Sequence, residues 1–107
     1  MAIEKIEKAD LKHYFDNLSR ILPDESVQIE VVGMDVGDQL AADNVRLEGI
    51  SYDESNDEIV IHLANAADHN ISGPQEVYVE QNDNGLQSME ITCSKGHKHI
   101  IKLKVPA

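Results

Sequence analysis

Residues 77–105 of the chain read VYVEQNDNGLQSMEITCSKGHKHIIKLKV. Apolar and polar residues alternate here in three runs, which is the period of a strand with one buried face. Two segments separate the runs, Asp83-Asn84-Gly85 and Ser94-Lys95-Gly96. A three-residue hairpin loop has glycine at its third position, where a left-handed conformation closes a bulge. This stretch therefore predicts a three-stranded antiparallel meander.

The two loops predict one common register. The facing pairs are Val79 with Met89, Val77 with Ile91, Tyr78 with Glu90, Met89 with Ile101, Ile91 with His99, and Cys93 with His97. Both loops place the same side chains on one buried face: Val77, Val79, Met89, Ile91, Cys93, Ile101, Leu103 and Val105. A shift of one residue would bring polar partners onto this face, so the register is strongly specified.

Upstream, residues 45–63 predict another hairpin around the acidic turn at residues 54–57. The pairs it brings together are Ile50 with Ile61 and Tyr52 with Ile59. Val45 and Leu47 have the opposite parity, and Gly49 lies between the two sets. A glycine inside a strand is typical of a bulge that changes which side chains point inward. We therefore expect a strongly bent strand.

The N-terminal part predicts one amphipathic helix at about residues 10–22. Its apolar residues recur at spacings of three and four: Leu11, Tyr14, Phe15, Leu18, Ile21 and Leu22. Asp10 is the predicted N-cap, and Pro23 ends the helix. Ile3 and Ile6 precede it as a short extended arm.

These elements predict an α+β fold in a single domain, residues 1–107. The helix precedes a strongly bent antiparallel sheet of five or six strands over about residues 26–105. A helix of about twelve residues is only about 18 Å long, too short to cover a flat sheet of that width. The sheet is therefore expected to curl towards a small half-open barrel with the helix over one end. Some outward positions are apolar, and they predict either the surface on which the helix packs or a subunit interface: Val32, Val60, Tyr78 and Ile100.

The charge of the chain limits its partners. Nine Lys and Arg against twenty Asp and Glu give a net charge of −11, which disfavours binding to nucleic acid or to anionic membranes. Residues 91–107 nevertheless carry only basic charge. The outward row of the last strand is a candidate interaction strip: Lys98, Ile100, Lys102 and Lys104. The alternative is that these lysines protect a sheet edge from pairing with other chains.

Residues with metal or catalytic chemistry form no strong motif. One face of the last hairpin carries Cys93, His97 and His99, whose side chains suit zinc or copper. A fourth ligand is missing unless the fold brings His69 or His62 to the same place. We expect no tight metal site and no cofactor.

The acid-rich turn at residues 53–58 lacks the glycine of a calcium loop. No nucleophile elbow, glycine-rich phosphate loop or H-E-x-x-H is present, so we expect no enzyme activity and assign no catalytic residue.

Three further segments carry a family resemblance. They are Gly33-Met34-Asp35-Val36-Gly37-Asp38-Gln39, then Leu47-Glu48-Gly49-Ile50-Ser51-Tyr52-Asp53, then Gly96 to Leu103. With the patterns G-x-D-x-G-x-Q, L-x-G-I-S-Y-D and G-x-x-x-I-I-x-L, the chain resembles a small bacterial family of uncharacterised single domains. The resemblance implies no assigned activity, cofactor or partner. Asp35, Gln39 and Asp53 either cap turns or form a polar loop that holds a ligand.

The sequence thus favours a cytoplasmic, non-enzymatic domain that binds a protein partner or a second copy of itself. The single cysteine fits a reducing compartment, and no more than three consecutive residues are strongly apolar, so no membrane segment is expected. The alternative is a small-ligand or metal-binding protein that uses the Asp35 and Gln39 loop or the Cys93 hairpin.

Overall fold

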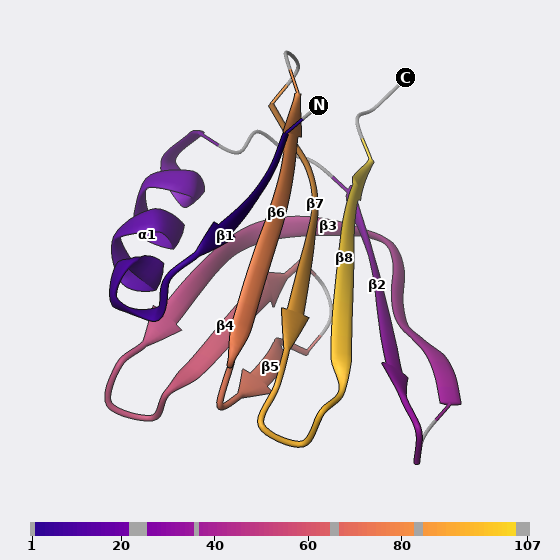
Figure 1. Cartoon of the computed structure of the whole chain (residues 1–107). Helices are drawn as coiled ribbons and strands as arrows, with labels where there is room; N and C mark the ends of the chain where they lie inside the picture. The colour runs from indigo at the N-terminus through magenta and orange to yellow at the C-terminus, as the bar shows by residue number, and fades with distance from the viewer. Residues whose placement is uncertain (1, 22–25, 36, 65–66, 83–84, 105–107) are drawn as a thin grey trace.

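Eight antiparallel strands form one curled sheet in the part of the chain that the computed structural model describes, residues 2–21, 26–35, 37–64, 67–82 and 85–104 (Figure 1). The strands are β1 (Ala2–Ile6), β2 (Ser26–Gly33), β3 (Gly37–Asp53), β4 (Glu58–Leu63), β5 (His69–Ser72), β6 (Glu76–Asn82), β7 (Gly85–Thr92) and β8 (Lys98–Lys104). A 3-10 turn, Lys8–Asp10, and helix α1, Leu11–Ile21, lie between β1 and β2. Across the sheet the order is β1-β6-β7-β8-β2-β3-β4-β5.

The predicted curled antiparallel sheet is confirmed, but the prediction of five or six strands was too low. The expected N-terminal arm is a strand, β1, which pairs with β6 at one edge. The other edge is β5, a four-residue strand in which Ile71 is the buried residue. Both strands are too short to display a convincing alternation in the sequence, and they form because an existing sheet offers them a paired edge.

The predicted register of β6, β7 and β8 is confirmed at every pair in the described strands. In the β7–β8 turn, Gly96 has a φ of 82° and donates its N–H to the carbonyl of Cys93, as expected for the third loop residue. The β6–β7 loop differs. Gly85 pairs with Asn82, and the register shift lies further along, between Glu80 and Gln81. Residues 83–84 and the predicted inward Val105 lie outside the described residues.

The long strand β3 belongs to both halves of the sheet. Its N-terminal half pairs with β2, and its C-terminal half pairs with β4. The predicted change of face is confirmed, because the register with β4 shifts between Leu47 and Gly49. Two further shifts occur opposite Ile29 of β2, close to Asn44, which has a φ of 56°. Extra residues on one strand bend it and increase its twist, so β3 arches across the back of the molecule (Figure 1).

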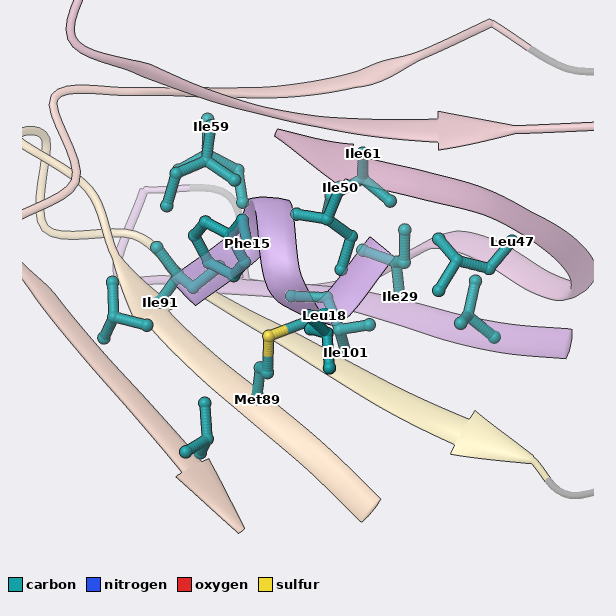
Figure 2. Close-up of a cluster of buried hydrophobic side chains, with 14 of the residues drawn as sticks. Phe15, Leu18, Ile29, Leu47, Ile50, Ile59, Ile61, Met89, Ile91 and Ile101 are labelled. Carbon is teal, nitrogen blue, oxygen red and sulfur yellow. The ribbon is translucent and has the colours of Figure 1, made fainter. Parts of the chain in front are cut away.

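Helix α1 lies on the inner side of this curl, beside β1 (Figure 1). Leu11, Phe15 and Leu18 are buried in one cluster with the inner side chains of the strands, and Figure 2 shows the Phe15 ring among the isoleucines. The helix therefore does not pack on the apolar residues of the outer face. Asp10 is not an N-cap but the last residue of the 3-10 turn that leads into α1. No helix in the described part of the chain is long and apolar enough to cross a membrane.

The two faces of β4 predict unequal losses of stability when a side chain is truncated. Ile59 is fully buried, whereas its neighbour Val60 is half-buried on the outer face. We expect Ile59→Ala to lower the free energy of unfolding by about 2–5 kcal/mol, because it leaves a cavity in the core, and Val60→Ala to cost less than about 1 kcal/mol. Urea denaturation of both variants measures the difference. Equal losses would contradict the assignment of the two faces.

Candidate functional site

Two histidines from distant strands meet inside the curled sheet. His99 lies on β8 between Ile91 of β7 and Val31 of β2, and it is 8% exposed. His69 begins β5, where it pairs with Ile61 of β4. Nε2 of His69 lies 2.9 Å from Nδ1 of His99, so one imidazole donates a hydrogen bond to the other. This contact ties the edge strand β5 to β8, although β2, β3 and β4 lie between them in the sheet order.

Burial keeps both imidazoles neutral. It lowers the pKa of His69, and together with the neighbouring His69 and His97 it lowers the pKa of His99 to about 4. A positive charge on either ring would be held in a poorly solvated place beside another imidazole. The pair is therefore a neutral hydrogen-bonded contact at pH 7.

The side chain of His97 is bound by the β2–β3 turn. Its Nε2 lies 2.7 Å from Oδ1 of Asp35. A Cβ atom at Gly33 would lie only 2.5 Å from Cδ2 of the His97 ring, so any other residue at that position would displace the ring. The predicted backbone pairing of His97 with Cys93 is also present, because the Cys93 N–H donates to the His97 carbonyl at 2.9 Å. Asp35 thus joins two turns that are distant in the sequence.

The candidate metal ligands are near one another, but the two histidines among them make other contacts. Cys93, His97 and His99 border a hollow of about 180 Å³. Nε2 of His97 binds Asp35, Nδ1 of His99 binds His69, and Cys93 is a buried free thiol. Among the residues that the structure describes, no group of three or more His, Cys, Asp or Glu side chains is placed to hold a metal ion.

The candidate polar-loop residues lie in different parts of the fold. Gln39 pairs with Val31 near the start of β3, whereas Asp53 is the last residue of that 17-residue strand. Oδ1 of Asp53 accepts the N–H of Ser55 at 3.0 Å, and its Oδ2 accepts Nδ2 of Asn56 at 2.8 Å. Asp53 therefore caps the β3–β4 turn.

The lysine strip lies on a strand inside the sheet. Lys98, Ile100 and Lys102 point outward from β8, which pairs with β7 on one side and β2 on the other. Nζ of Lys98 lies 3.3 Å from Oε1 of Glu90 on β7. The side chain of Lys104 lies outside the described part of the structure. Because β8 is not an edge strand, the edge-protection alternative is wrong.

A serine, a histidine and an aspartate form a hydrogen-bonded chain that the sequence analysis did not identify. Ser51 Oγ lies 3.2 Å from Nε2 of His62, and Nδ1 of His62 lies 3.2 Å from Oδ2 of Asp68. These contacts have the order of a catalytic triad. The chain is open to solvent, however, with the His62 and Asp68 side chains 42% and 47% exposed. Because both ring nitrogens of His62 are engaged in it, His62 does not act as the fourth ligand considered for Cys93.

A cavity of about 380 Å³ was also missed from the sequence. It opens between α1, β1 and the end of the β6–β7 hairpin. Ile6, Leu18, Gln81 and Leu86 help to line it, although 80 residues separate the first from the last. No local motif could have identified it, because the pairing of β1 with β6 creates it.

Comparison with known proteins agrees with the resemblance noted in the sequence. The family of unknown function DUF5335 matches residues 2–107. The chain belongs to this family. It is also similar to an uncharacterized protein of Aquifex aeolicus (strain VF5), with 38% identity over 104 residues that span 97% of this chain and 94% of the relative. No solved structure is significantly similar to this DUF5335 chain.

The histidine pair predicts a loss of stability in mild acid. Because the pKa of His99 falls from 6.5 to about 4 on folding, the unfolded chain binds more protons between these two pH values. Its free energy of unfolding should therefore fall as pH is lowered from about 6.5 to about 4, by on the order of 2–3 kcal/mol from this group. Urea denaturation at several pH values measures this.

The matched variants are His99→Asn and His13→Asn, the second at an exposed position on α1. His99→Asn should flatten the pH dependence in this window, whereas His13→Asn should leave it unchanged. An unchanged slope in His99→Asn would show that other groups cause the acid sensitivity.

Proposed function

We propose that this DUF5335 domain is a non-enzymatic, cytoplasmic protein-interaction module that binds through its β8 face, the outer face of β6, β7, β8, β2 and the start of β3. One observation carries the proposal: interior strands present apolar side chains outward. Tyr78, Ile100 and Leu40 belong to one cross-strand row on this face, and Leu40 is 54% exposed. Burial of such exposed apolar side chains against a partner is favourable, which supports a binding role for this face.

Charged side chains separate the apolar ones on this face. Glu90 stands between Tyr78 and Ile100, and Glu30 stands between Ile100 and Leu40. Lys98 and Lys102 flank the row on β8. Apolar groups mixed with charges of both signs are common in interfaces that form and dissociate, since such interfaces are about as polar as the rest of the surface.

The surroundings of the Ser51–His62–Asp68 chain favour a non-enzymatic role. An acyl-transfer site needs a cleft that excludes water and donors that stabilise an oxyanion. The three residues line neither the cavity beside α1 nor the hollow at Cys93. Their hydrogen bonds instead link β3, β4 and the segment before β5, which supports a structural role.

The partner we expect first is a second copy of the chain, because symmetric homodimers are the commonest soluble oligomers. Val60 does not belong to the same surface as Ile100, since it lies on β4, beyond β2 and β3 in the sheet order. A dimer built on the β8 face would place Tyr78 and Ile100 at the centre of the contact and Lys98 and Lys102 at its rim.

Lysine substitutions on the two outer faces test this interface. Ile100→Lys places a charge between Glu90 and Glu30, which the monomer tolerates, but it would put that charge inside the contact. We expect it to weaken association at least tenfold in sedimentation equilibrium. Val60→Lys, with Ser51 and Asn70 as its neighbours, is the matched control and should leave association unchanged.

Salt separates the two contributions to this contact. Association that depends on apolar burial should persist or strengthen at 1 M salt, whereas contacts made by lysines alone should weaken as the screening length falls from about 10 Å to about 3 Å. A chain that stays monomeric at high protein concentration and all salt concentrations would exclude the dimer. Equal effects of the two lysine variants would exclude the β8 face.

Hydrolysis of p-nitrophenyl acetate tests the non-enzymatic part of the proposal. We expect the unmodified chain and Ser51→Ala to give the same rate within about twofold, because Ser51 lines neither the cavity beside α1 nor the hollow at Cys93. His62→Gln serves as the second variant. A loss of tenfold or more in both variants would mean that the Ser51–His62–Asp68 chain is catalytic.

A further inference from the structure

The cavity beside α1 combines an apolar floor with an acidic opening. Ile6 of β1 and Leu18 of α1 are buried side chains in its wall, and the half-buried Leu86 of β7 completes the apolar part. Its volume of about 380 Å³ is within the range of small-molecule sites, roughly 300–1,000 Å³. The adjoining core is closely filled around Phe15, which is fully buried. The cavity is therefore a separate space beside the core.

Tyr14 supplies a fixed polar group in this wall. Its hydroxyl accepts a hydrogen bond of 3.0 Å from Nε2 of Gln81 on β6. Burial is the main cause that raises the pKa of Tyr14, so the phenol stays protonated and keeps a proton to donate. The edge-on contact of the Tyr14 and Phe15 rings, with centroids 5.6 Å apart, holds the ring in place.

The opening of the cavity is negatively charged. Glu4, Glu7 and Asp10 line it, against the single lysine Lys5 among the lining residues. Glu4 pairs with Val79 and so lies on the inner side of β1, close enough to Tyr14 to affect its pKa. Glu7 makes no side-chain capping bond to the 3-10 turn that follows it. With the whole chain at −11, this opening repels anions and attracts cations.

We propose that this cavity binds a small apolar molecule that carries one positive charge, such as a hydrophobic amine. The hydrocarbon part would lie against Ile6, Leu18 and Leu86, and the ammonium would lie at the opening near Glu7 and Asp10. The apolar wall supplies affinity through burial, and the carboxylates select for the cation. This site is separate from the β8 face and does not depend on it.

Three probes of one shape and different charge test the proposal. 2-Naphthylmethylamine, 2-naphthylmethanol and 2-naphthoate are titrated into the 15N-labelled chain, and amide shifts are followed by NMR. We expect the amine to bind about tenfold more tightly than the alcohol, and the carboxylate to bind still more weakly. Shifts should centre on Ile6, Leu18 and Leu86, and the affinity for the amine should fall with added salt.

Charge variants locate the selectivity. The double variant Glu7→Gln/Asp10→Asn should lose about three- to tenfold in affinity for the amine and should leave the affinity for the alcohol unchanged. Glu48→Gln/Glu54→Gln changes the net charge equally at exposed positions that do not line this cavity. It should have little effect.

The proposal is overturned if the amine moves no amide around the cavity, or if the alcohol and carboxylate bind as tightly as the amine. It is also overturned if both double variants weaken the amine equally, because net charge alone would then account for binding.

Discussion

Between Leu47 and Gly49 the pairing of β3 with β4 slips by one residue, and the inner face on both sides of this bulge depends on that slip. Before it, Leu47 points into the core, and after it Ile50 does so. Without the extra residue, one half of the 17-residue strand would turn its apolar side chains to solvent. Because the bulge also bends β3, the sheet curls far enough for a helix of 11 residues to fill its inner side.

The curl creates two different ends. At one, the β2–β3 turn, the β7–β8 turn and β5 approach one another, and polar contacts hold them: Asp35 with His97, and His69 with His99. At the other, β1 and α1 leave an open cavity because their side chains do not meet completely. The cavity at this end is thus larger than the hollow beside Cys93, and the histidine contacts join the strands at the opposite end.

The outer surface follows from the same geometry. Because β8 is covered by neighbours on both edges, its outward lysines have no protective role in pairing, and their face is a candidate for contact with another protein. The Ser51–His62–Asp68 chain also faces outward, on the smaller half of the sheet. It links β3, β4 and the segment before β5, and its His62 and Asp68 side chains are open to solvent, which fits the structural role proposed above.

The sequence by itself determined the register of β6, β7 and β8, because alternation and glycine turns are local signals that a one-residue slip would destroy. It also determined the change of face at Gly49, since a break in parity beside a glycine is typical of a bulge. Only the tertiary structure decided that β1 and β5 are strands, because such short segments form strands only beside an unpaired edge of an existing sheet. It also decided which polar groups meet, since 30 residues separate His69 from His99 and 62 separate Asp35 from His97. Contacts of that range depend on how the sheet curls, which no local pattern encodes.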